Sequence, residues 1–150
     1  MWPYVVAASV FAVDQLTKWA VIRFMEMGES IPIWEGVFHL TSHRNRGAAF
    51  GILQGQRWLF VLITVVVVIG VIAYLNRTRN RRPLVATALA LLLGGALGNL
   101  VDRIRFGEVV DFLDARLINF PIFNVADSAI VIAVALLLWD MWGASRNTTG

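Results

Sequence analysis

The chain has 150 residues and a net charge of +3, and 58% of its residues are hydrophobic while only 15% are charged. This composition, with a mean hydropathy of +0.69, leaves too little polar surface for a soluble globular domain and indicates a single integral membrane domain, residues 1–150. Cysteine is absent, which excludes thiol catalysis, disulfide bonds and thiolate metal sites.

The first predicted membrane span covers about residues 2–25, although it contains Asp14, Lys18 and Arg23. A cleaved signal peptide is the alternative interpretation of this segment. A signal peptide begins with a basic region, which is missing before the apolar residues here, so the sequence favours a retained span.

The connection that follows contains the runs IPIW and VFHLTSH on either side of Glu35 and Gly36. Two short apolar runs around a tight turn predict a pair of β-strands. An open sheet edge cannot face lipid, so we expect these strands at the membrane surface.

Three further spans are predicted at about residues 58–75, 84–101 and 124–142. The first two carry no charge over 18 residues, which as helix cover roughly 27 Å and match a hydrocarbon core. Between them lies RTRNRR (77–82), which holds four of the thirteen basic residues. Such a cluster is typical of an inside loop rather than a nucleic-acid-binding surface, so we expect both termini inside and no nucleic-acid partner.

Ionisable residues within the spans are the informative positions, because a charge inside a bilayer needs a partner or a function. Asp14 and Lys18 are four apart and can pair on one helix face, either to orient the helix or to act directly in a site. Asp102 is expected to be held ionised by its neighbours Arg103 and Arg105.

Asp111 and Asp127 lie in the connection before the last span and at its start. Taken alone, Asp127 is equally well explained as a residue that satisfies free N–H groups at a helix N-terminus. If the chain folds Asp111 back beside Asp127, however, the two carboxyls can share a proton and act as base and acid on a water molecule.

Other functional classes fit less well. His39 and His43 would share a strand face, but no third metal ligand is evident, and nothing places a serine beside Lys18. A small transporter remains an alternative, although the second span offers only Thr64 and the terminal Tyr74 to a polar pathway.

Five separated motifs occur in the order DQLTK (14–18), NRGAAFG (45–51), GNLVDR (98–103), VVDF (109–112) and FNVADS (123–128). In these motifs the chain resembles bacterial lipoprotein signal peptidase, also called signal peptidase II. The resemblance implies a four-transmembrane-helix bundle with a small periplasmic-side β-cradle and a short, mobile outer helix. It also implies a bacterial inner-membrane enzyme with cytoplasmic termini and its active site at the outer face.

The resemblance further implies an aspartic endopeptidase that needs no cofactor or metal and acts, as a monomer, at the membrane lipid. Its substrates would be diacylated prolipoproteins, cut at the lipobox before the lipid-bearing cysteine. Matched by position, the catalytic residues are Asp111 and Asp127, and Asp102 is a rival that we set aside because its arginine neighbours would hold it charged. The supporting positions that the motifs imply are Asp14, Lys18, Asn45, Gly47, Asn99, Arg103, Asn124 and Ala126.

Overall fold

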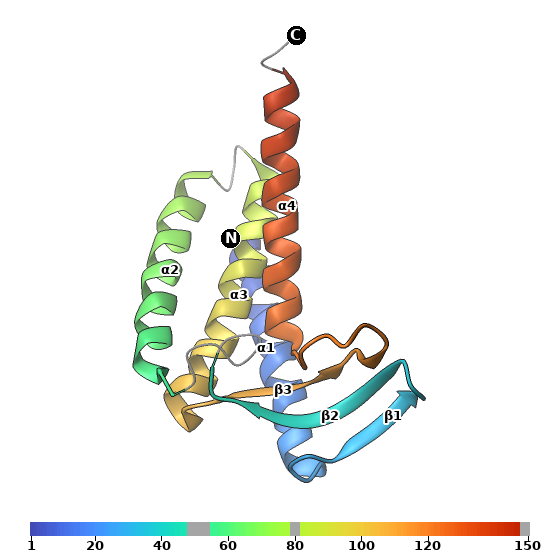
Figure 1. Ribbon diagram of the computed structural model, residues 1–150. Helices are drawn as coiled ribbons and strands as arrows, with labels where there is room; N and C mark the ends of the chain where they lie inside the picture. The colour runs from blue at the N-terminus through green and yellow to red at the C-terminus, as the bar shows by residue number, and fades with distance from the viewer. Residues whose placement is uncertain (48–54, 79–81, 148–150) are drawn as a thin grey trace.

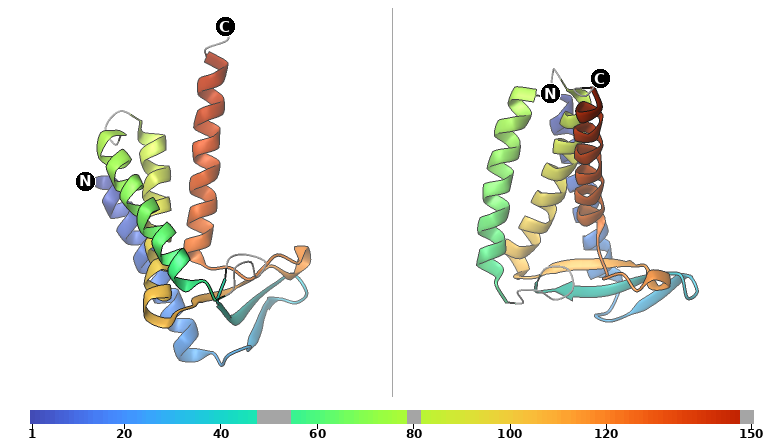
Figure 2. Two further views of the ribbon diagram at one scale, coloured as in Figure 1. Left: turned by 60° about the vertical axis from the view of Figure 1, so that its left-hand side comes forward. Right: turned by 45° about the horizontal axis from the view of Figure 1, so that its top comes forward.

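The protein is a bundle of four long helices with a small sheet lying across one end (Figure 1). The computed structural model describes residues 1–47, 55–78 and 82–147. Its elements, in chain order, are α1 (Trp2–Phe24), β1 (Ser30–Trp34), β2 (Phe38–Asn45), α2 (Arg57–Thr78), α3 (Pro83–Phe106), β3 (Val109–Asp114), the 3-10 turn η2 (Arg116–Ile118) and α4 (Val125–Asn147). The N-terminus and the end of α4 lie at the end of the bundle away from the sheet (Figure 2).

The four helices confirm the four predicted spans, and each is long and apolar enough to cross a membrane. Helices α3 and α4 each continue five residues past the predicted limit, α3 from Val101 to Phe106 and α4 from Trp142 to Asn147. The added turn of α3 carries three charged residues, and the first of them, Asp102, is buried against α1 where it pairs with Lys18. Gly107, in the left-handed conformation at φ 79°, ends the helix.

Helix α3 is the most buried of the four, and the other three pack around it. Glycine permits this close packing at two positions. A Cβ at Gly95 would lie 2.5 Å from the carbonyl oxygen of Ala126 on α4, and one at Gly98 would collide with the Asp14 carboxylate on α1. Helices α1 and α4 therefore approach α3 closely at the depth where the polar side chains gather.

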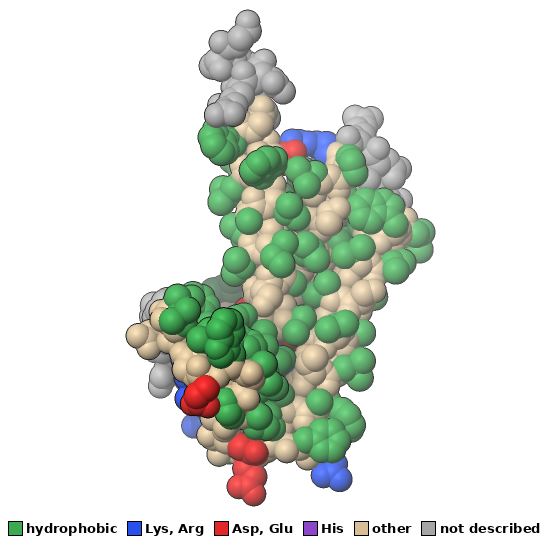
Figure 3. Space-filling model, turned by 90° about the vertical axis from the view of Figure 1, so that its right-hand side faces the viewer, with side chains coloured by type: hydrophobic (Ala, Val, Ile, Leu, Met, Phe, Trp, Pro, Cys, Tyr) green, Lys and Arg blue, Asp and Glu red, His purple; other side chains and the backbone are tan. Residues whose placement is uncertain are grey.

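The sides of the bundle are covered by hydrophobic side chains, and on the face shown in Figure 3 the charged groups gather toward its two ends. Trp19, Leu62, Val66 and Val131 are among the exposed apolar residues. A continuous apolar belt with charged ends matches a bilayer on the outside of the protein.

The sheet has three antiparallel strands in the order β1-β2-β3. The β1–β2 hairpin turns at Glu35 and Gly36, as predicted. Strand β3 was not predicted, and the expected short outer helix between the third and fourth spans is limited to the three-residue turn η2. Pairing of β3 with β2 places Asp111 directly opposite His43.

One expectation for β2 is wrong. The register between β2 and β3 shifts between Leu40 and His43, so regular alternation is interrupted. As a result His39 is buried and bonded to Ser30 and Gly36, whereas His43 is exposed. The two histidines do not share a face.

Candidate active site

A cavity of about 570 Å³ opens where the sheet meets the start of α4. Asp111 from β3 and Asp127 from α4 both line it, together with Asn45 of β2. The rest of its wall is largely apolar: Ala115, Ile118, Phe120, Pro121, Ile122, Phe123, Ser128, Ile130, Val131 and Ile132. The two aspartates predicted to act together therefore face one largely apolar space.

Asn124, which is fully buried, joins the two aspartates. Its side-chain Nδ2 donates to Asp111 Oδ1 at 2.7 Å, and its backbone N–H donates to Asp127 Oδ2 at 3.2 Å. The backbone N–H of Asp127 donates in return to Asn124 Oδ1 at 2.9 Å. This reciprocal pair caps the N-terminus of α4, so Asp127 also has the helix-terminal role that the sequence suggested.

The remaining carboxylate oxygens are bonded to two other asparagines. Asn45 Nδ2 donates to Asp111 Oδ2 at 3.1 Å, and Asn99 Nδ2 donates to Asp127 Oδ1 at 2.8 Å. All four oxygens thus accept an amide N–H, which orients the two carboxyl groups without supplying them an acidic proton. A proton held at this site has to reside on the carboxyl groups themselves.

The pKa of Asp111 is raised from 3.8 to about 7, first because the carboxyl is buried and second because Asp127 carries a like charge. The hydrogen bonds from Asn45 and Asn124 and the positive charge of Lys18 oppose this rise in pKa without cancelling it. A carboxyl group with a pKa near neutrality can both hold and release a proton under physiological conditions.

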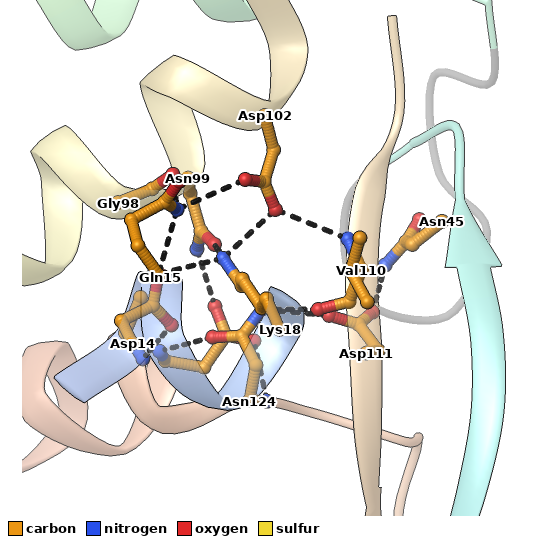
Figure 4. A network of polar contacts seen from close by, with 12 residues as sticks. Asp14, Gln15, Lys18, Asn45, Gly98, Asn99, Asp102, Val110, Asp111 and Asn124 are labelled. Atoms are coloured by element: carbon orange, nitrogen blue, oxygen red, sulfur yellow. Dashed lines mark hydrogen bonds and ion pairs between the residues drawn. The ribbon is translucent and has the colours of Figure 1, made fainter. Parts of the chain in front are cut away.

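A buried ionic cluster lies beside the aspartates (Figure 4). Lys18 Nζ is 2.9 Å from Asp14 Oδ2, as the four-residue spacing predicted, and also 2.9 Å from Asp102 Oδ2. The ion pair that Asp102 forms is with Lys18 of α1, a partner that the sequence did not predict, while the charge of Arg103, one of the two expected partners, also interacts with it. The reason is that α1 packs directly against the buried face of α3, which sequence spacing along α3 cannot reveal.

Asp102 is also separated from the main cavity. It lines a smaller cavity of about 210 Å³ between α1 and α3, together with Gln15, Lys18 and Arg105. Its Oδ1 accepts from Gln15 Nε2 at 3.0 Å, and its Oδ2 accepts the backbone N–H of Val110 at 3.2 Å. These partners hold Asp102 in the ionic cluster beside the aspartate pair, and it does not line the cavity that the pair shares.

Arg103 and Gly47 lie at the other side of the site. The Arg103 guanidinium is 4.9 Å from the centre of the Phe60 ring, and its NH2 is 3.5 Å from the carbonyl oxygen of Gly47. Its positive charge interacts with Asp127 and Asp111. The rest of the NRGAAFG motif, residues 48–51, lies outside the described residues.

Ala126 contributes to the site through close packing of its small side chain and through a backbone hydrogen bond. The side chain is fully buried against Gly98, and the backbone N–H donates to Asp14 Oδ1 at 2.9 Å. Gln15 was missed by the sequence reasoning, although it bonds Asp14, Asp102 and the carbonyl of Gly98. A polar amide beside an aspartate in an apolar helix was the available signal.

The fold and the site together define a polytopic membrane protein with two aspartates in an apolar cavity at one end of its bundle. A family model described as signal peptidase (SPase) II matches residues 6–143. The chain therefore belongs to the signal peptidase II family, and it is a peptidase.

Curated relatives and solved structures agree with this assignment. The chain is 57% identical over 142 residues to a lipoprotein signal peptidase of Brevibacillus brevis, covering 95% of each chain. It is 51% identical over 140 residues to one of Bacillus subtilis, covering 92% of this chain and 91% of the relative. A solved bacterial membrane enzyme superposes with a TM-score of 0.92 at 37% identity, covering 97% of this chain and 90% of the other.

Proposed function

We propose that this peptidase removes the signal peptide from diacylglyceryl-modified prolipoproteins, cutting before the lipid-bearing cysteine, with Asp111 and Asp127 as its catalytic residues. The observation that carries the proposal is that these two carboxyls, from β3 and α4, face one cavity and are joined through Asn124. The names of the curated relatives, lipoprotein signal peptidase, supply the substrate class.

The wall of the cavity supports a lipid-bearing substrate. Phe120, Ile122 and Phe123 from the segment before α4 face Ile130 and Val131 from α4 itself. Apolar side chains in such number suit an acyl chain or an apolar peptide segment, while the few polar groups sit where the chemistry is needed.

The proposed reaction uses one proton shared by the two aspartates. The ionised carboxylate removes a proton from a water molecule as its oxygen attacks the scissile carbonyl carbon, and the protonated carboxyl stabilises the developing oxyanion. The resulting tetrahedral intermediate collapses by breaking the carbon–nitrogen bond, and the leaving amine takes a proton from the pair. The raised pKa of Asp111, about 7, suits it to hold the shared proton at neutral pH.

The asparagines act in this scheme by orienting the carboxyl groups. Asn45, Asn99 and Asn124 each donate an amide N–H to an aspartate, so their contribution is to the geometry of the pair. In this scheme Arg103, which lies over the Phe60 ring, would bind a backbone or lipid carbonyl of the substrate.

In the bacterial cytoplasmic membrane, the Arg-rich connection between α2 and α3 and both termini would face the cytoplasm, with the sheet and the aspartates at the outer surface. The enzyme would act as a monomer. A lipid-anchored precursor then reaches the site from the bilayer, with its scissile bond at the outer interface.

The direct test uses purified Asp111→Asn and Asp127→Asn variants with a diacylated lipobox peptide as substrate. Loss of either carboxyl removes acid–base catalysis, so we expect kcat to fall roughly 100- to 10,000-fold. Thermal unfolding of each variant must remain close to that of the unmodified enzyme. Full activity in either correctly folded variant would refute the assignment.

The same assay tests whether Asp102, rather than Asp111, is one of the two catalytic aspartates. Because its carboxylate is bound by Lys18 and lies on the smaller cavity, Asp102→Asn should lose much less kcat than the two catalytic variants. Turnover by Asp111→Asn together with complete loss in Asp102→Asn would reverse the two roles.

A further inference from the structure

We propose that Lys18 is a positioning residue whose ammonium group fixes the placement of Asp111 and Asp127 relative to each other. This inference rests on the proposed function, because it assumes that these two aspartates carry the chemistry. It gives the buried ionic cluster a purpose beyond anchoring α1.

All three N–H donors of the Lys18 ammonium group have an acceptor. Only 2% of the side chain is exposed, and Nζ lies 2.9 Å from Asp14, 2.9 Å from Asp102 and 2.8 Å from Asn99 Oδ1. An ammonium has three N–H donors and no acceptor, so three acceptors at these distances use all of its hydrogen-bonding capacity (Figure 4).

The contact of Lys18 with Asn99 leads to the Asp127 carboxylate. Lys18 and Asn124 both donate to Asn99 Oδ1, at 2.8 and 3.1 Å. With its oxygen held by two donors, the Asn99 amide must turn its NH2 group to the opposite side, where it donates to Asp127 Oδ1 at 2.8 Å. A donor-only group at position 18 thus determines which way the Asn99 amide faces.

The other two contacts lead to the backbone beside each aspartate. Asp102, held by Lys18, accepts the N–H of Val110, the residue before Asp111, at 3.2 Å. Asp14, also held by Lys18, accepts the N–H of Ala126, the residue before Asp127, at 2.9 Å. One ammonium therefore connects β3 and the first turn of α4 to a common point on α1.

Stability alone is a weak explanation for this cluster. Buried ion pairs pay a large desolvation penalty, and well-packed apolar residues in their place are often at least as stable. Asp14, Lys18 and Asp102 are only 0–2% exposed. Each bonds a residue that adjoins or holds one of the two aspartates, which is what a precisely positioned pair requires.

The test is a Lys18→Met variant, which keeps the length and packing of the side chain but removes its charge and donors. We expect kcat for the diacylated lipobox peptide to fall about 100-fold, because catalysis is that sensitive to ångström-scale misplacement, while KM stays unchanged. An Arg82→Met variant is the matched control: it removes the Arg82–Asp140 ion pair at the opposite end of the bundle and should retain full kcat.

The pH profile supplies a readout that a purely structural role would not move. Burial and Asp127 raise the pKa of Asp111, and the charge of Lys18 opposes them. The other polar groups that interact with Asp111 are Arg103, Asn45 and Asn124, and all three remain in the variant. Lys18→Met should therefore shift the alkaline limb of the kcat profile to higher pH.

A double variant keeps the proposal testable if Lys18→Met leaves too much buried negative charge to fold. Two carboxylates and one ammonium leave one negative charge, and Lys18→Met combined with Asp102→Asn leaves one as well. We expect this variant also to lose kcat with unchanged KM. Unmodified kcat in either folded variant, or a rise in KM alone, would overturn the positioning role.

The two proposals fail in different ways. Inactive Asp111→Asn and Asp127→Asn variants beside a fully active Lys18→Met variant would refute the positioning role and leave the aspartate pair standing. Active aspartate variants would refute the proposed function itself, whatever Lys18→Met does.

Discussion

At the scale of single residues, the helix-capping role of Asp127 does not compete with the catalytic role proposed for it. One oxygen of its carboxylate accepts the backbone N–H of Asn124 and so caps α4, while the other accepts an N–H of the Asn99 side chain. A residue held by a helix cap cannot rotate freely, which suits a group that must face a substrate in one orientation. The structural explanation of Asp127 thus supports the catalytic one.

The raised pKa of Asp111 predicts how the activity of the enzyme depends on pH. This pKa is raised to about 7, so the pair retains its shared proton below that pH and loses it as the pH rises through about 7. Since the proposed active form needs this proton, kcat/KM for the lipobox peptide should fall above about pH 7. The measurement is a pH–rate profile in detergent micelles, and a rate that stays constant well above pH 7 would contradict a proton held by Asp111.

The sequence predicted the identities of these residues better than their contacts. Asp14 and Lys18 are four apart on one helix, and helix geometry alone placed them together. Lys18 was missed as the ion-pair partner of Asp102, because the packing of α1 on α3 is a tertiary contact with no trace in local spacing. Gln15 was overlooked although its place beside Asp14 in an apolar helix was a signal; its bonds to Asp102 and Gly98 appear only in the structure.

At the scale of elements, α3 positions the site through its small residues. Gly98 lies against the Asp14 carboxylate and Ala126, so α1, α3 and α4 meet at one depth. Any side chain at this position would separate the helices that hold the two ends of the hydrogen-bond network.

A Gly98→Ala substitution should therefore lower both stability and activity. The added Cβ collides with Asp14, and such overpacking destabilises by about 1–3 kcal/mol. The matched control is Gly70→Ala on α2, where a Cβ meets nothing within 4 Å and helix propensity favours alanine. Thermal unfolding and peptide cleavage measure both variants. Equal behaviour of the two would show that the close approach at Gly98 is not required.

Strand β3 shows the limit of prediction at this scale. In VVDFLD, five of six residues are buried and the sixth is partly buried, so the alternation that marks a surface strand is absent. Its strand conformation is determined by pairing with β2, more than sixty residues earlier in the chain. The same pairing brings Asn45 to Asp111.

At the scale of the whole molecule, four membrane-crossing helices require both termini on one side and the sheet on the other. The Arg-rich connection between α2 and α3 predicts that the terminal side is cytoplasmic. The site would then face the outer surface, where lipid-modified precursors emerge.

The natural absence of cysteine makes this orientation easy to test. Single cysteines at two exposed positions, Glu35→Cys in the β1–β2 turn and Arg77→Cys at the end of α2, can be labelled with a membrane-impermeant maleimide. In intact spheroplasts we expect labelling of Glu35→Cys only, and of Arg77→Cys after permeabilisation. The unmodified chain is the unlabelled control. The reverse pattern would invert the proposed topology.

By itself, the sequence determined that the protein is a four-span membrane protein, and its motifs marked the family and the candidate residues. These properties depend on composition, helix length and local spacing, all of which can be read directly from the sequence. Only the tertiary structure decided that Lys18 pairs with Asp102, that Asp111 lies on a strand, and that three asparagines orient the two carboxyls. The physical reason is that each of these contacts joins elements distant in sequence, and their partners are chosen by packing rather than by spacing.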